Sequence, residues 1–234
     1  ERIADLQKQI TESGLVFARN IREDKGDITL KPEALAGLPQ DYLDAHKPRA
    51  DGLVHLTYDY PDVLPVLKFA NVRETRHQVM VAFLNRGYPA NDAVLKRLLE
   101  QRYALAQALG LPDYATEVMA DKMIGNPQRA AKFLDDVNAA AKPAADADYA
   151  ELLAFARTLD PSIEKLEAWD NNYNSNLLQK QKYDVDAAQV RKYFTYDKAR
   201  TGIFQLVHDL FGADIRPWKT QTWDKSVSAW ELYD

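Results

Sequence analysis

The chain contains no cysteine among its 234 residues. This excludes disulfide bonds, thiolate nucleophiles and cysteine-ligated zinc, and it leaves both cytoplasm and periplasm open as compartments. Glycine is scarce, with 9 residues, which disfavours a β fold built on many tight turns. No apolar run reaches the roughly 18 residues of a membrane-spanning helix. We therefore expect no membrane partner.

Sequence motifs for several kinds of catalysis are also missing. The chain has no Gly-x-Ser-x-Gly turn for a serine nucleophile. It has no Gly-x-Gly-x-x-Gly or Gly-Lys-Ser/Thr loop for phosphates. The formal net charge of −5 and the sequence pI near 5.5 argue against a broad basic surface. No nucleic-acid partner is expected, because phosphate backbones are bound through lysine and arginine.

The histidines offer little for a metal. They are His46, His55, His77 and His208, and no two are four residues apart, so no helix carries His-x-x-x-His. Glu74 and His77 form one Glu-x-x-His unit, whereas di-iron bundles use two. An ordinary surface or packing histidine is the alternative for His77. We therefore assign no catalytic, cofactor-binding or metal-binding residue to this chain.

Two further groups have a functional and a structural interpretation. Asp135 and Asp136 could suggest acid–base chemistry, but sequence neighbours on a helix do not face each other, which favours a solvated surface. Aromatic side chains could line a peptide-binding groove or could belong to the core. The aromatic residues concerned are Tyr58, Tyr60, Trp169, Tyr173, Tyr193 and Phe194.

What is abundant favours helices. Hydrophobic residues make up 46% and charged residues 28% of the chain, and apolar residues recur at helical spacing. The sequence predicts a mainly α, multi-helix domain with one or two short β-strands, at about 53–60 and 222–233. The second strand would need a partner for its backbone groups, and we expect that partner outside the given sequence.

Capping residues predict where several helices begin and end. The first helix should end near Asp24–Gly26, and a short helix should follow Pro32. Asn91, Asn126-Pro127 and Asp160-Pro161 are the expected starts, and Gly110 and Gly212 the expected ends. The alanine-rich stretch 139–150, which contains Pro143, is expected to connect two helices.

The order of several segments resembles the family of zinc oligopeptidases that includes thimet oligopeptidase, oligopeptidase A and bacterial peptidyl-dipeptidase. Residues 52–64, GLVHLTYDYPDVL, are similar to its strand followed by Tyr-Pro. Residues 71–86, NVRETRHQVMVAFLNR, resemble its Asn-x-Arg-x-x-Arg helix. Residues 91–115, NDAVLKRLLEQRYALAQALGLPDYA, resemble its Leu-x-x-Arg, Ala-x-x-Leu-Gly and Tyr-Ala series.

The resemblance continues to the end of the chain. Lys122-Met123 and Pro127 follow in the family's order, then LEAWDNNY at 166–173, similar to its Trp-Asp-x-x-Tyr helix. RKYF at 191–194 and LFG at 210–212 come next, and residues 223–234 resemble a strand opened by Trp. Asp224 stands where the family often has His, and Thr195 where it usually has Pro.

The resemblance implies a zinc metallopeptidase acting on short peptides in a channel between two mostly helical halves. The family's His-Glu-x-x-His helix and later Glu match no position here. Residues 1–234 are therefore expected to be the helical N-terminal, channel-wall region, truncated before the zinc-binding segment, without zinc and inactive alone. Its partners would be short peptides, the missing C-terminal catalytic part and, through an exposed apolar face, a second copy. The alternative is a non-enzymatic helical module that binds a peptide or a protein.

Overall fold

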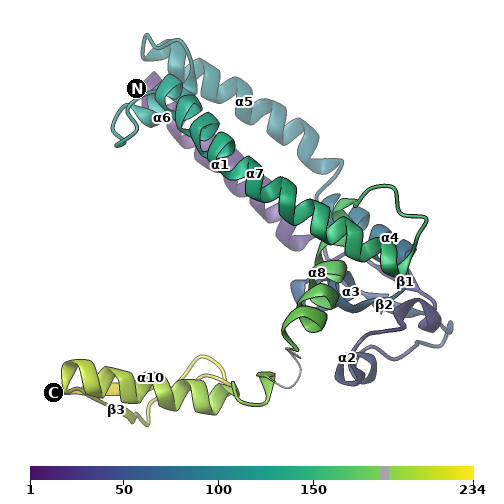
Figure 1. Cartoon of the computed structure of the whole chain (residues 1–234). Helices are drawn as coiled ribbons and strands as arrows, with labels where there is room; N and C mark the ends of the chain where they lie inside the picture. Colours follow the sequence, from purple (N-terminus) through teal and green to yellow (C-terminus); the bar gives the residue numbers. More distant parts are fainter. Residues whose placement is uncertain (185–189) are drawn as a thin grey trace. The chain divides into compact units, whose positions relative to one another are not determined.

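A computed structural model describes residues 1–184 and 190–234, and it divides the chain into two compact units, Glu1–Leu178 and Gln179–Asp234 (Figure 1). Each unit is described by itself. Helices dominate among the described residues, which confirms the prediction of a mainly α fold with a few short strands. No helix in these residues is both long enough and apolar enough to cross a membrane.

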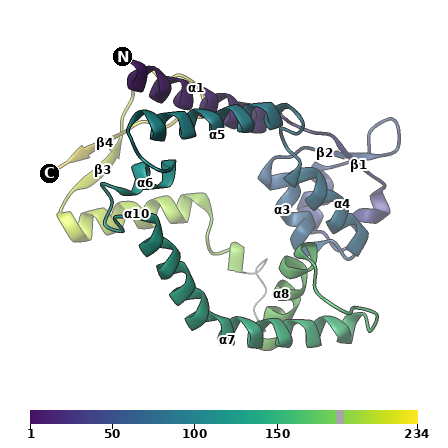
Figure 2. The same ribbon diagram turned by 90° about the horizontal axis from the view of Figure 1, so that it is seen from above.

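The first unit opens with α1 (Arg2–Glu23), which lies beside α5 (Ala90–Ala108) (Figures 1 and 2). The two helices are antiparallel, because Ser13 Oγ donates to Gln101 Oε1 at 2.8 Å while Asn20 Nδ2 donates to Asn91 Oδ1 at 2.9 Å. Hydrogen bonds between side-chain amides and hydroxyls therefore hold the two helices together where polar side chains face each other. The short helix α6 (Tyr114–Met119) follows, capped by the Asp113 side chain.

The main core forms where short elements pack together. Strands β1 (Ile28–Leu30) and β2 (Val54–Leu56) pair antiparallel, with Thr29 opposite His55. Around them lie a 3-10 turn (Pro32–Leu35), α2 (Gln40–Ala45), α3 (Tyr60–Phe69) and α4 (Arg73–Leu84). Alternate residues of both strands point inward, as a half-buried strand requires. The fully enclosed side chains include Leu35, Val54, Leu56, Val63, Val66 and Val79.

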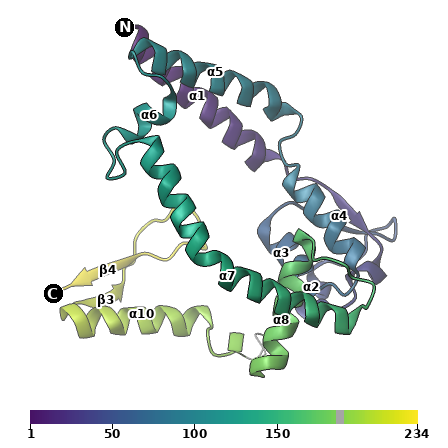
Figure 3. The same ribbon diagram turned by 45° about the horizontal axis from the view of Figure 1, so that its top comes forward.

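The last elements of the first unit are α7 (Pro127–Leu159) and the first part of α8 (Ala168–Tyr183), both labelled in Figure 3. The boundary between the units falls within α8, after Leu178. Ala156, Ile163 and Leu166 form a second, smaller core at the C-terminal end of α7. By contrast, every residue from 131 to 151 of α7 is exposed.

The second unit contains α10 (Tyr196–Phe211) and strands β3 (Asp214–Pro217) and β4 (Trp230–Tyr233). The strands pair antiparallel, with Ile215 opposite Leu232. The Phe204 and Trp230 rings meet edge to face at 4.8 Å between centroids, which places an aromatic contact between the helix and the strands.

The predicted strands needed correction. The expected strand at 53–60 is only Val54–Leu56, because Asp59 and Pro61 already begin α3. The expected strand at 222–233 is only Trp230–Tyr233, because Asp224 turns the chain by accepting bonds from Ser226 N and Oγ. The expectation that this strand's partner lies outside the sequence was wrong, since β3 pairs with it.

Some helix ends were predicted well and others were not. Gly110, which follows α5, has a φ of 73°, and Gly212, which ends α10, has a φ of 71°, as expected for helix ends. Asn126 caps α7, also as expected. Asn91 is not a cap: it is buried inside α5 and donates to Phe17 O at 3.1 Å. Asp160 ends α7 instead of starting a helix. The stretch 139–150 is no connection but the middle of α7, because alanine sustains a helix even beside Pro143.

Candidate functional site

The strongest concentration of buried charge lies where α4 meets α8. Asp170 is fully buried and accepts bonds from Arg73 Nε at 2.9 Å and Arg73 Nη2 at 2.6 Å. Arg76 Nη2 donates to the same carboxylate at 3.2 Å. The side chain of Arg76 is 3% exposed and that of Arg73 is 43% exposed. One carboxylate therefore holds two guanidiniums, in what we call the α4–α8 ion-pair cluster.

Local structure explains how Asp170 is placed. It stands in the first turn of α8, where its carboxylate accepts the backbone N–H of Glu167 at 3.0 Å. An acidic side chain at this position satisfies a free N–H and interacts favourably with the helix dipole. Asn174, one turn later, donates from Nδ2 to the Asp170 carbonyl at 2.8 Å and is itself buried.

Arg76 makes the most complete set of contacts. Its Nη1 donates to Ala70 O at 2.7 Å and its Nε to Trp169 O at 3.1 Å. Its guanidinium lies 4.1 Å from the centre of the Tyr173 ring, and the Tyr173 hydroxyl donates to Asn71 Oδ1 at 3.2 Å. A buried arginine is tolerated when its donors are satisfied in this way.

The electrostatics of the cluster favour the charged forms of Asp170 and Arg73. Burial raises the pKa of Asp170, but hydrogen bonds from Arg73, the Glu167 amide and Arg76 outweigh it, and the net pKa is lowered. Burial lowers the pKa of Arg76, and the hydrogen bond to Asp170 raises that of Arg73. Both carboxylate oxygens of Asp170 carry hydrogen bonds. The cluster is therefore suited to positioning α8 on α4 rather than to exchanging protons.

The cluster unites two patterns that the sequence shows far apart. Asn71, Arg73 and Arg76 come from the Asn-x-Arg-x-x-Arg pattern, while Asp170 and Tyr173 come from Trp-Asp-x-x-Tyr. Sequence reasoning did not predict that they touch. The sequence did contain one signal for this contact. The first pattern has two arginines, and the second has a single aspartate, between aromatic residues, that could pair with them.

A second contact joins two other patterns. The guanidinium of Arg102, from Leu-x-x-Arg, lies 5.1 Å from the ring centre of Tyr114, from Tyr-Ala. Arg102 Nε is buried and has no hydrogen-bond partner within the described part of the chain. The contact between α5 and α6 therefore rests on cation–π attraction and packing.

The four histidines lie in separate environments. His77 Nδ1 is 3.3 Å from Glu74 Oε1, and its ring is 4.2 Å from that of Trp169. His46 Nε2 is 3.1 Å from Asp62 Oδ1, while its Nδ1 is 2.9 Å from Tyr42 O.

The other two histidines are also held by carboxylates. His55 lies between Asp27 and Asp51, and His208 Nδ1 is 3.0 Å from Asp214 Oδ1. Across residues 1–184 and 190–234, no three histidine, aspartate or glutamate side chains gather into a possible metal site. The donor groups described here therefore do not fit a zinc ion.

The other sequence candidates are dispersed. Tyr58 packs against the main core, Tyr60 is exposed beside Phe83, and Tyr193 and Phe194 belong to the second unit, where both are exposed. Trp169 and Tyr173 belong to the ion-pair cluster. Asp136 is bound by Lys132 Nζ at 2.8 Å, and Asp135 is exposed beside it on α7.

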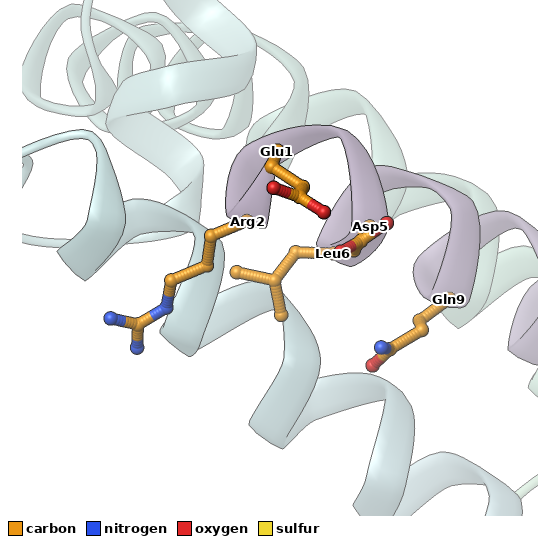
Figure 4. A pocket seen from close by; sticks show the side chains of 5 residues that line it. All are labelled: Glu1, Arg2, Asp5, Leu6 and Gln9. Atoms are coloured by element: carbon orange, nitrogen blue, oxygen red, sulfur yellow. The ribbon is translucent and has the colours of Figure 1, made fainter.

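A shallow pocket lies along the first turns of α1. Its lining consists of Glu1, Arg2, Asp5, Leu6 and Gln9, with Arg2 and Gln9 projecting on either side of Leu6 (Figure 4). The five residues come from the start of α1 and the residue just before it, and no catalytic pair converges there. We assign no function to this pocket.

Comparison with known proteins assigns the chain to a protein family. The model of peptidase family M3 matches residues 66–234, which include both halves of the α4–α8 cluster. The chain belongs to this family of peptidases.

Two of the similar proteins carry the name oligopeptidase A. Oligopeptidase A of Salmonella typhimurium is 31% identical, and oligopeptidase A of Escherichia coli is 30% identical, each over the whole of this chain. Saccharolysin of Saccharomyces cerevisiae is 27% identical, also over the whole chain. The chain spans 37% of the length of the two bacterial relatives and 35% of the yeast one.

Proposed function

We propose that residues 1–234 are the helical, channel-wall region of a zinc metallopeptidase that hydrolyses short peptides, and that this chain alone is not catalytic. The observation that carries the proposal is the family match, together with relatives named oligopeptidase along the whole chain. Residues near the active site of the parent enzyme would determine whether it cuts peptides internally or removes dipeptides from them.

The chemistry of the described residues supports the second part of the proposal. Each histidine is engaged by its own carboxylate, and the largest cluster of charge is closed by mutual hydrogen bonds. In the family that the sequence resembles, zinc would polarise a peptide carbonyl and acidify a bound water. We assign no step of that chemistry to these residues, because they do not offer the ligands.

The alternative, a non-enzymatic module, would be expected to close its apolar surface. Exposed side chains of Phe133, Leu134, Ile203, Leu206 and Leu210 weigh against it. Neither unit closes its apolar surface by itself, as expected for parts of a larger enzyme, and we take the catalytic part to contribute to covering these side chains.

The test is peptide cleavage by the purified chain. A mixture of internally quenched short peptides is incubated with the chain and added zinc, with and without a chelator, and Escherichia coli oligopeptidase A serves as positive control. We expect no cleavage by the chain and no stoichiometric zinc by elemental mass spectrometry. Chelator-sensitive cleavage that co-purifies with the 26.6 kDa chain would refute its assignment as non-catalytic.

A further inference from the structure

The turn between α2 and β2 contains the single Asp-Gly pair of the sequence, Asp51-Gly52, and the sequence has no Asn-Gly pair. In an Asp-Gly pair the backbone nitrogen of glycine can attack Cγ of the aspartate, because glycine has no side chain to obstruct the approach. The Cγ–N bond forms and the Cγ–OH bond breaks, and the hydroxyl leaves as water with the amide hydrogen. The product is a succinimide ring.

Water reopens such a ring at one of its two carbonyl carbons. Attack at Cγ regenerates aspartate, whereas attack at the main-chain carbonyl carbon gives isoaspartate, in which the backbone passes through Cγ and gains one carbon. The mass of the chain is the same before and after. An isoaspartate at position 51 would displace the carboxylate that contacts His55 and lengthen the backbone just ahead of β2, which begins at Val54.

The folded turn holds each of the reacting groups. The Gly52 N–H donates to Arg49 O at 2.9 Å, so the attacking nitrogen is engaged with a carbonyl. Asp51 Oδ1 accepts from Leu53 N at 2.9 Å, as aspartate commonly does in turns, and Asp51 Oδ2 lies 2.8 Å from His55 Nε2. Ring closure therefore requires that these hydrogen bonds break.

His55 is the partner that comes from outside the turn. Its side chain is 11% exposed, and its Nδ1 lies 2.7 Å from Asp27 Oδ1, so carboxylates accept hydrogen bonds from both ring nitrogens. Hydrogen bonds from Leu53 N and His55 hold the pKa of Asp51 below its usual range. Because Cγ loses water only from a protonated carboxyl, a carboxylate that is held ionised reacts slowly.

We propose that Asp51 is a site of spontaneous modification, at which this chain forms succinimide and then isoaspartate, and that His55 is the residue that slows the reaction. The reactive pair and the contacts that restrain it lie between residues 27 and 55, within the first unit. The reaction consumes nothing but water, which it also releases. It is independent of any peptidase activity, because its measure is the chemical form of one residue.

The first experiment follows isoaspartate in the full chain during storage in warm, mildly acidic buffer. Trypsin releases residues 50–68 as one peptide, which carries Asp51 together with Asp59 and Asp62, each of which precedes a bulky residue. Chromatography separates the aspartyl and isoaspartyl forms, and electron-transfer fragmentation assigns the position. We expect isoaspartate to accumulate at Asp51 faster than at the two internal references. Accumulation at Asp51 that is no faster than at either reference overturns the proposal.

Two substitutions on the facing strands of the small sheet test the role of His55. His55→Val removes both donors at a strand position that suits a β-branched residue, and we expect isoaspartate to form at least about fivefold faster, because a hydrogen bond to a charged group is lost. Thr29→Val changes the residue opposite His55 and should leave the rate within about twofold. Circular dichroism establishes that both variants are folded. An unchanged rate in His55→Val, or equal acceleration by both variants, overturns the assignment of His55.

Unfolding separates the effect of the contacts from the effect of the sequence. In concentrated urea the turn is lost, so wild type and His55→Val should react at one rate, faster than the folded wild type. Equal rates for folded and unfolded wild type would overturn protection by the fold.

A substitution of the glycine tests the chemical route. Gly52→Asn keeps a residue type that tolerates the φ of 77°, and its Cβ meets nothing within 4 Å. The added side chain obstructs attack on Cγ, so isoaspartate at Asp51 should fall to the level of Asp59 and Asp62 in the same peptide. An unchanged rate in Gly52→Asn would overturn the succinimide route.

Discussion

Removing the carboxylate of Asp170 should destabilise the first unit more than any other single charge removal. Asp170→Ala leaves Arg76, whose side chain is 3% exposed, without its counter-ion, and leaves the Glu167 amide without its acceptor. Breaking a buried pair from one side typically costs about 3–5 kcal/mol, because the remaining charge stays desolvated. We expect a loss in this range in the free energy of unfolding.

Tryptophan fluorescence gives the assay. Trp169 precedes Asp170, and the other three tryptophans, Trp218, Trp223 and Trp230, lie in the second unit. Replacing those three with phenylalanine leaves Trp169 as the reporter of the first unit in urea unfolding. Asp121→Ala, which removes an exposed ion pair with Lys122, is the control and should cause no measurable loss. A loss below about 1 kcal/mol for Asp170→Ala would refute the reasoning.

The pH dependence follows from the lowered pKa of Asp170. A carboxyl whose folded pKa lies below its unfolded value, near 3.9, contributes stability above that value. That contribution is lost as the pH falls through the folded pKa. Asp170→Asn should therefore narrow the stability difference between neutral and strongly acidic pH, and an unchanged pH profile would contradict this assignment.

Two further predictions concern the small sheet and the glycines. His55 lies 2.7 Å from Asp27 and 2.8 Å from Asp51, and hydrogen bonds to Asp51 and Asp27 raise its pKa. The resulting stability is present below the unfolded pKa of about 6.5 and is lost as pH rises through the folded value, so His55→Gln should flatten thermal stability across that window. Gly26 has φ of 59° and a Cβ there would collide with the Tyr58 ring, so Gly26→Ala should cost about 1–3 kcal/mol. Gly14→Ala, in open space on α1, should instead gain about 0.5–1 kcal/mol in urea unfolding, and equal effects of the two would contradict the geometry.

Helix ends were predictable where a single residue type carries the information. Gly212 ends α10 because a left-handed φ is needed there, and Asn126 with Pro127 starts α7 through a cap and a proline that needs no hydrogen bond. Strands β1 and β3 were missed because neither lies within a longer run of β-forming or aromatic residues, which is the signal that located β2 and β4. Asn91 was misjudged because a cap and a buried amide share the same side chain, and only the neighbouring α1 decides between them.

The candidate site was predictable only in part, for a reason that concerns distance along the chain. Arg73 and Asp170 are 97 residues apart, and 30 basic and 35 acidic residues allow many possible pairs. Local sequence rules describe neighbours within a turn or two, so they cannot select one such pair. The prediction that the chain carries no catalytic motif could be made directly from the sequence, because it required only residue types and spacings.

The residues in the sequence patterns that carry the family resemblance contact one another between different segments of the chain. Asn71, Arg73 and Arg76 meet Asp170 and Tyr173, and Arg102 meets Tyr114. Each contact joins two segments of a helical framework and offers no free nucleophile or base. A buried ion pair is costly unless its geometry is complete, so all members must be kept together or lost together. This explains how a chain can carry a peptidase family's characteristic residues while those residues serve to hold its helices in place.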